Sequence, residues 1–180
     1  MRRTVVFVEK QTQSGQDLFI RGGVSQPSVS SVPISVRRLP DQWSLYNDWS
    51  TGDHSLDWDG AESGQGTHNG QEALGTPLGW TSSNPGNQFH HELNRWGDHY
   101  WIVDMDMDCS QTSDGWFEFE TVFTNGGESG ETDINQENCD GSAGGDDPVN
   151  SRYHAGRCGY MNIVHYNSNK CTIENIPNKL

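Results

Sequence analysis

The strongest constraint on the fold is the alternation of apolar and polar residues from Tyr100 to Phe123, which read YWIVDMDMDCSQTSDGWFEFETVF. Successive side chains of a β-strand point to opposite faces. The first run therefore places a tryptophan, a valine and two methionines on one face and Asp104, Asp106 and Asp108 on the other. The second run, residues 116–123, places three phenylalanines on one face, and Ser-Asp-Gly at 113–115 supplies a turn. The pattern predicts an antiparallel hairpin with one face in the core and one solvated acidic face.

Shorter runs of the same kind predict further strands at 4–10, 17–21, 31–38, 159–166 and 170–176. The first two runs predict either a compact hairpin or a strand-turn-strand corner. Pro33 restricts the 31–38 segment to the edge of a sheet, because proline lacks the N–H that a central strand needs. Residues 39–94 have no period, and we expect long ordered loops there. No helical period is present, so we expect one all-β, antiparallel β-sandwich domain over residues 1–180, with long loops rich in Gly and Trp.

The net charge of the chain limits the kinds of partner that it can bind. The chain has 25 acidic and 11 basic side chains and a formal charge of −14. This charge repels phosphate backbones and anionic membranes, so nucleic acid and membrane are both excluded as expected partners. Three explanations of the acidic charge remain: the chain binds a neutral ligand, it binds a cation, or the charge serves only to keep the protein soluble. The apolar run Val5–Val8 is too short for a signal segment or a membrane span.

The four cysteines lie at positions 109, 139, 158 and 171, with no C-x-x-C spacing. A zinc ribbon or redox dithiol is therefore disfavoured, and two disulfides are the preferred interpretation, with free buried thiols as the alternative. Disulfides in a chain rich in Gly, Asn and Trp indicate an oxidising compartment, so we expect a secreted, extracellular protein.

Seven tryptophans is a high number for one small domain, and several stand in polar loops. An indole ring stacks on the apolar face of a pyranose, while neighbouring amide, carboxylate and imidazole groups bind the hydroxyls. Trp43, Trp49, Trp80 and Trp96 each have such neighbours and are candidate sugar-binding residues. For each one, the alternative is a ring that pins its loop to the core. Trp101 shares the apolar face of its strand and is expected in the core.

Asp57, Asp59 and Glu62 stand in the sequence DWDGAE, which has the D-x-D-G opening of a calcium loop. Calcium prefers several carboxylate and carbonyl oxygens on a sharply turned backbone. An EF-hand is excluded, since His68 stands where the bidentate Glu belongs, and a generic calcium site is the remaining candidate. Calcium is the only cofactor suggested, and no motif for a catalytic nucleophile, a Walker loop or a zinc protease is present.

Several segments together resemble the starch-binding, carbohydrate-binding modules attached to secreted α-amylases. They are VVFVEKQTQSGQDLFIRGG, LDWDGAE, GTPLGWT, NRWGDHYWIVDMDMDCS and DGWFEFETVFTNG. The resemblance implies an immunoglobulin-like sandwich that binds α-glucan without catalysis and carries an attached hydrolase domain to its substrate. It also implies the pairings Cys109–Cys158 and Cys139–Cys171.

One departure from that resemblance concerns the glucan-stacking Trp-Glu pair after the FEF strand. Glu131 is kept, but Gly130 stands where the indole would fall. The binding site would then lie at other tryptophans, or the ligand differs from starch. We therefore expect noncatalytic binding of a neutral polysaccharide, most simply an α-glucan. The alternative is a calcium-stabilised extracellular structural or assembly sandwich without a sugar site.

Overall fold

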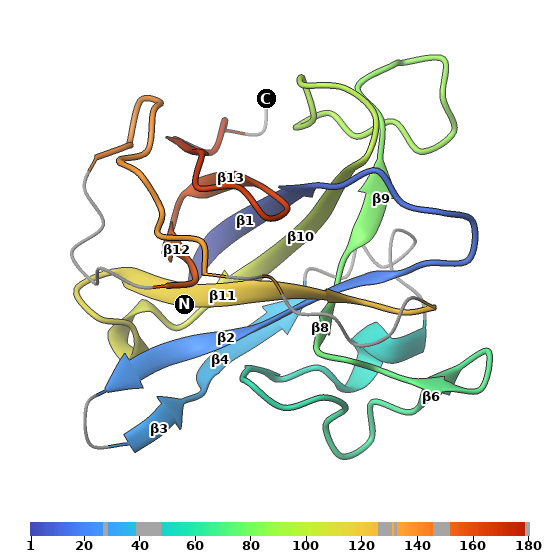
Figure 1. The fold of residues 1–180 in the computed structure, drawn as a ribbon, viewed down its shortest axis with the longest axis horizontal. Helices are drawn as coiled ribbons and strands as arrows, with labels where there is room; N and C mark the ends of the chain where they lie inside the picture. Colours follow the sequence, from blue (N-terminus) through green and yellow to red (C-terminus); the bar gives the residue numbers. More distant parts are fainter. Residues whose placement is uncertain (27–28, 39–47, 126–130, 132, 146–151, 179–180) are drawn as a thin grey trace.

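The computed structural model describes residues 1–26, 29–38, 48–125, 131, 133–145 and 152–178, and it shows two main β-sheets packed face to face (Figure 1). Apart from strands, the described residues form two short 3₁₀ turns, η2 (Asp48–Gly52) and η3 (Cys109–Gln111). No helix in these ranges is long and apolar enough to cross a membrane.

The larger sheet contains seven strands, and six of them follow one another in hydrogen-bonded order. That order is β14 (Cys171–Glu174), β13 (Met161–His165), β1 (Arg2–Glu9), β10 (Tyr100–Met107), β4 (Ile34–Arg38) and β5 (Ser55–Leu56). The seventh strand, β9 (Gly79–Thr81), also pairs with β10. β1 and β13 run parallel, so this sheet is mixed and not purely antiparallel as predicted.

The smaller sheet is antiparallel in every described pair. Its order is β12 (His154–Arg157), β11 (Trp116–Phe123), β2 (Leu18–Gln26) and β3 (Val29–Val32), with β8 (Thr76–Pro77) also pairing with β2. A separate small hairpin is formed by β6 (Thr67–His68) and β7 (Gln71–Glu72).

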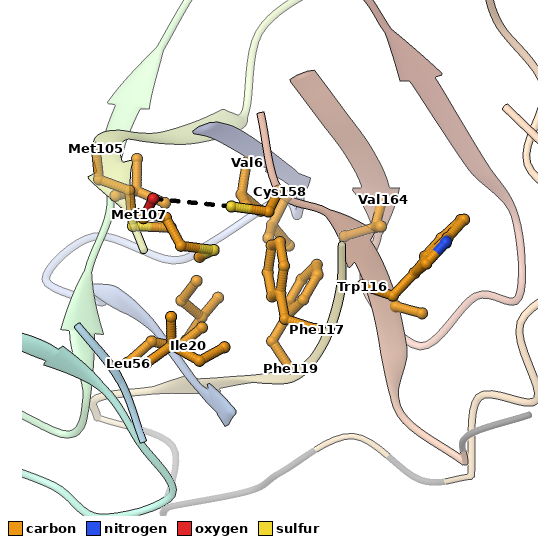
Figure 2. Close-up of a cluster of buried hydrophobic side chains, with 14 of the residues drawn as sticks. Val6, Ile20, Leu56, Met105, Met107, Trp116, Phe117, Phe119, Cys158 and Val164 are labelled. Carbon is orange, nitrogen blue, oxygen red and sulfur yellow. Dashed lines mark hydrogen bonds between the residues drawn. The ribbon is translucent and has the colours of Figure 1, made fainter. Parts of the chain in front are cut away.

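The core lies between the two sheets and is filled by the inward-facing residues that alternation predicts. Phe117 and Phe119 enter it from the smaller sheet, and Val6, Met105 and Met107 enter it from the larger one (Figure 2). All five side chains are fully buried. The predicted all-β sandwich is confirmed.

The predicted hairpin of residues 100–123 is wrong, because its two strands belong to different sheets. β10 pairs with β1, β4 and β9, whereas β11 pairs with β2 and β12. Alternation reports which face of a strand is buried but not which strand lies beside it. Two strands that face each other across a core have the same pattern as a hairpin. Of the two alternatives predicted for the first two strands, the corner is observed and the hairpin is not, because β1 and β2 also belong to different sheets.

The acidic face of β10 is not solvated as predicted. Asp104 is fully buried, and the Arg3 guanidinium donates to both of its carboxylate oxygens, at 3.0 and 2.6 Å. Asp106 pairs with Arg37 at 2.8 Å. Arginines of the neighbouring strands β1 and β4 therefore neutralise two of the three carboxylates in the row, those of Asp104 and Asp106. The outer face of the sheet also holds a second apolar cluster, which includes Phe7 and Ile102.

Most of the predicted strands are present, and several short ones were missed. The segments 4–10, 17–21, 159–166 and 170–176 correspond to β1, β2, β13 and β14. The predicted edge strand 31–38 is divided at Pro33 into β3 and β4, and β4 lies inside its sheet between β10 and β5. The expected loops of residues 39–94 contain β5 to β9, which are two or three residues long and too short to show a period.

Both implied cysteine pairings are formed. Cys109 bonds to Cys158, which joins the end of β10 to the end of β12, and Cys139 bonds to Cys171 at the start of β14. The first bond therefore links the two sheets. Two disulfides indicate an oxidising compartment.

Candidate functional site

An open pocket of about 620 Å³ lies at the end of the sandwich where β1 passes into β2. Figure 1 shows that the β1–β2 loop, the segment between β9 and β10 and the β6–β7 hairpin all project at this end. Eleven residues line the pocket: Thr12, Gln13, Ser14, Gln16, Trp80, Gly86, Asn87, Gln88, Phe89, His99 and Trp101.

Aromatic rings form the apolar part of this pocket. Trp80 and Trp101 are register partners on β9 and β10, so their side chains lie on the same face of the sheet. The Phe89 ring meets Trp80 edge-to-face at 5.8 Å between centroids. Phe89 is 48% exposed, and it is one of only two large apolar side chains in the described residues that face solvent, the other being Met1. An exposed ring braced by a second ring offers a flat surface for stacking.

His99 fixes the orientation of Trp80. The indole Nε1–H donates to His99 Nδ1 at 3.1 Å, and the two rings lie nearly perpendicular, at 89°. Because Nδ1 accepts this bond, the proton of the neutral imidazole is on Nε2, where it can donate to a ligand. The backbone of His99 has a φ of 66° and its carbonyl accepts from Lys10 N, which joins the site to the end of β1.

The β1–β2 loop is held in shape by its own side chains. Gln16 Oε1 accepts from the backbone N–H of Gln13 at 2.9 Å, and Gln13 O accepts from Gln16 N at 3.1 Å. Gly15 has a φ of 84°, and its carbonyl accepts from the Asn125 side chain at 2.6 Å. The wall of the pocket is therefore formed before any ligand arrives, which lowers the entropy cost of binding.

The opposite wall is a series of tight turns capped by side chains. Asn84 N donates to Ser82 Oγ at 3.0 Å, and Gly86 N donates to Asn84 Oδ1 at 2.9 Å. Phe89 N donates to Asn87 Oδ1 at 2.8 Å. These are Asx- and Ser-type turns, in which a side-chain oxygen accepts a hydrogen bond from a backbone N–H two residues later, in place of the hydrogen bonds of a β-sheet. They set Phe89 at the rim of the pocket.

Among the described residues, the lining contains no Asp, Glu, Lys or Arg, although such residues make up 20% of the chain. Rings, amides, hydroxyls and one imidazole remain. This set can stack on the apolar face of a neutral ring and bind its hydroxyls. It holds no pair of carboxylates of the kind that glycoside hydrolysis uses.

A second pocket, of about 280 Å³, uses other residues of the same β1–β2 loop. Gly15 and Asp17 line it, together with the β6–β7 hairpin and the residues that follow β11. Burial raises the pKa of Asp17 above its usual range, and the nearby His68 ring opposes this rise. This pocket differs from the first because it contains a carboxyl group.

Of the predicted sugar-binding tryptophans that the structure describes, only Trp80 lies in the aromatic pocket. Trp49 lines the second pocket but is 1% exposed, donates from Nε1 to Gln71 O at 2.9 Å and packs on Phe19. Trp96 lies on the outer face of the larger sheet, against Phe7 and stacked with Tyr100. The Trp49 ring pins its loop to the core, and the Trp96 ring packs on the apolar cluster of the outer face. Trp43 lies outside the described residues.

Glu131 is a buried framework residue. Its carboxylate accepts from the backbone N–H groups of Thr121 and Asn167, at 2.9 and 2.8 Å, and lies 2.7 Å from His154 Nε2. Burial alone would raise its pKa, but the His154 contact and the two backbone donors outweigh burial and lower it. The side chain is 1% exposed, so a ligand has no access to it in this structure.

Two of the three candidate calcium residues, Asp57 and Glu62, accept hydrogen bonds from backbone N–H groups of nearby residues. Asp57 Oδ1 accepts from Asp59 N at 2.9 Å, and the two oxygens of Glu62 accept from the backbone of His54 and Ser55 at 2.6 and 3.0 Å. The described residues contain no group of three or more His, Cys, Asp or Glu side chains placed to hold a metal ion. The structure therefore does not assemble Asp57, Asp59 and Glu62 into such a group.

Four features of the pocket were not predicted from the sequence: Phe89, Gln13, Gln16 and the second role of Trp101, which lines the pocket as well as the core. For Phe89 a signal exists, because it is a lone aromatic residue in the polar run SSNPGNQFHH. Gln13 and Gln16 carry no such signal. No protein-family model, curated protein or solved structure matches the chain.

Proposed function

We propose that this chain binds a neutral polysaccharide without catalysis, at the aromatic pocket formed by Trp80, Phe89, Trp101, His99 and the β1–β2 loop. The observation that carries the proposal is the exposed Phe89 ring, braced edge-to-face by Trp80 inside a pocket lined otherwise by polar, uncharged groups. A concave pocket lined by aromatic rings together with a few polar groups is the usual composition of a small-molecule binding site, and Phe89 presents its ring in such a pocket.

The polar groups of the pocket suit a ligand with many hydroxyls. Amides of Gln13, Asn87 and Gln88 offer both donors and acceptors, and His99 Nε2–H is an additional donor. A sugar ring has hydroxyls around its edge and an apolar face, and both meet partners of the matching kind here. The absence of charge from the lining also avoids the cost of desolvating an ion on binding.

An α-glucan is the first polysaccharide to test, because the sequence resembles starch-binding modules. Secretion and attachment to a hydrolase domain are part of the same proposal, and the two disulfides support an oxidising compartment. The site differs from the one expected for such modules, since Phe89 and Trp80 take the place of the missing tryptophan of the Trp-Glu pair.

The test is a pull-down of the chain on insoluble polysaccharides, namely starch, cellulose, chitin and xylan, followed by titration of tryptophan fluorescence with maltoheptaose. We expect retention on starch and a saturable change in Trp80 emission. Release of reducing sugar from starch by the chain would contradict the noncatalytic part. Failure to bind any of the four would reject the proposal.

The calcium-stabilised structural alternative is tested in the same preparation. EDTA should leave both sugar binding and the melting temperature unchanged under our proposal. A sharp fall of the melting temperature in EDTA, together with no response to sugar, would favour the alternative.

A further inference from the structure

Among the described residues, the second pocket is lined by one carboxylate, that of Asp17, and by no Lys or Arg, and His68 is the one lining group whose charge opposes the rise in the Asp17 pKa. Its lining is Gly15, Asp17, Trp49, His68, Asn69, Gly70, Gln71, Thr124 and Asn125. The Asp17 carboxylate receives no hydrogen bond in the part of the chain that the structure describes. Its backbone is nevertheless fixed, because Asp17 N donates to Thr124 Oγ1 at 2.9 Å and Asp17 O accepts from Thr124 N at 3.1 Å.

A half-buried carboxylate without a donor carries a cost, since the ion has lost part of its water and has gained no hydrogen bond from the described residues, and the nearby His68 offsets this cost only in part. The raised pKa of Asp17 has this burial as its main cause. A ligand that brings a positive charge and N–H donors would offset the cost. A neutral sugar would supply hydroxyl donors only.

Two residues with neutral oxygen acceptors, Asn125 and Gln71, line the same pocket as Asp17. The side-chain nitrogen of Asn125 donates to Gly15 O at 2.6 Å, so its Oδ1 is left to accept. The side-chain nitrogen of Gln71 donates to Glu72 O at 3.0 Å, so Gln71 Oε1 is likewise left to accept a hydrogen bond. An ammonium group has three N–H donors and no acceptor, and it matches one carboxylate with two amide oxygens.

A metal ion fits this pocket less well. The described residues hold no group of three His, Cys, Asp or Glu side chains near one another, and Asp17 and His68 are the only residues of those types in the lining. Sugar stacking is also excluded here, because the Trp49 ring is 1% exposed. Recognition in this pocket is therefore through charge and hydrogen bonds.

We infer that the second pocket is a binding site for a protonated amine, with Asp17 as its charge partner. The site is separate from the polysaccharide pocket, although both use the β1–β2 loop. The amine is either carried on a sugar, as in a glucosamine unit, or belongs to a small alkylamine. Both sources share the ammonium group that the pocket recognises.

The test is an NMR titration of the isotope-labelled chain, in slightly acidic buffer at constant ionic strength, with glucosamine, glucose, N-acetylglucosamine and n-butylamine. We expect glucosamine to shift the backbone amides of Asp17, His68, Gly70 and Asn125, and glucose and N-acetylglucosamine to leave them unchanged. Equal binding of n-butylamine would assign the site to simple amines. Binding of glucosamine alone would assign it to amino sugars.

The variant Asp17→Asn keeps the shape of the side chain and the backbone bonds to Thr124, so we expect it to melt at or above the wild-type temperature. It should weaken amine binding by up to about fivefold, the value of one partly exposed ion pair. The matched control is Phe89→Ala, which should leave amine binding unchanged. Equal shifts with all four ligands, no effect of Asp17→Asn, or shifts that need a divalent metal would overturn the inference. Loss of polysaccharide binding alone would leave it standing.

Discussion

Replacing Phe89 by alanine should weaken polysaccharide binding about eightfold and hardly change stability. An aromatic side chain offers roughly 200 Å² of surface, and 48% of the Phe89 residue is exposed, so about 100 Å² is free for a ligand. A sugar ring stacked on one side covers about half of that area, roughly 50 Å². At about 25 cal/mol per Å², the lost contact is worth about 1.2 kcal/mol, or roughly eightfold in Kd.

Isothermal titration with maltoheptaose, or with the oligosaccharide that the pull-down selects, measures this change. Unfolding of the variant in urea should give a free energy within about 1 kcal/mol of wild type, because the ring is exposed and packs mainly on Trp80. The control is Trp96→Phe, which removes packing against Phe7 on the outer face of the larger sheet and should lower stability without changing Kd. If Phe89→Ala leaves Kd within twofold, or if Trp96→Phe abolishes binding, the assignment of the site is wrong.

Three further changes test the framework. Asp104→Asn leaves the Arg3 charge without its carboxylate and should lower the free energy of unfolding by about 2–4 kcal/mol in urea; a loss under about 0.5 kcal/mol would show that the pair is replaceable by water. Replacing Cys139 and Cys171 together by serine opens a link between residues 32 apart and should cost about 4 kcal/mol, seen as a large fall in melting temperature. Because the pKa of Glu131 is lowered in the folded state, its stabilisation is complete above the unfolded pKa and is lost as pH falls through the folded one. Glu131→Gln should therefore flatten the loss of stability between about pH 5 and pH 3, and an unchanged acid limb would argue against the lowered pKa.

Alternation in the sequence predicts strands reliably here because each strand buries one face against the same core. β11 has the predicted bounds, and β10 differs by only a few residues from the predicted run. Strand partners are a different matter. β10 and β11 both direct apolar side chains inward whether they are neighbours in one sheet or face each other across the core. Only the pairing of β1 with β10 and of β2 with β11 decides between these arrangements, and those partners are far apart in the sequence.

The loop tryptophans show a similar limit. Trp49 and Trp80 both lie in the part of the sequence that shows no period and both have polar residues close by, so local sequence does not separate them. What separates them is tertiary packing. Trp49 lies against Phe19 and is almost fully buried, whereas Trp80 packs on Phe89 and His99 at the end of the sandwich. A neighbour such as Phe19, brought in from another strand, is not visible from the residues beside the ring.

Phe89 points to a more useful rule for chains of this kind. Its segment, residues 82–89, begins with Ser and Asn side chains that cap their own turns, and such turns are recognisable from sequence alone. A loop that satisfies its own backbone in this way does not need a large ring to hold it down. An aromatic residue at the end of such a loop is therefore not needed to hold the loop in place, and in this chain its ring lines a pocket instead. Trp49 differs, since its ring and its indole N–H both secure neighbouring segments.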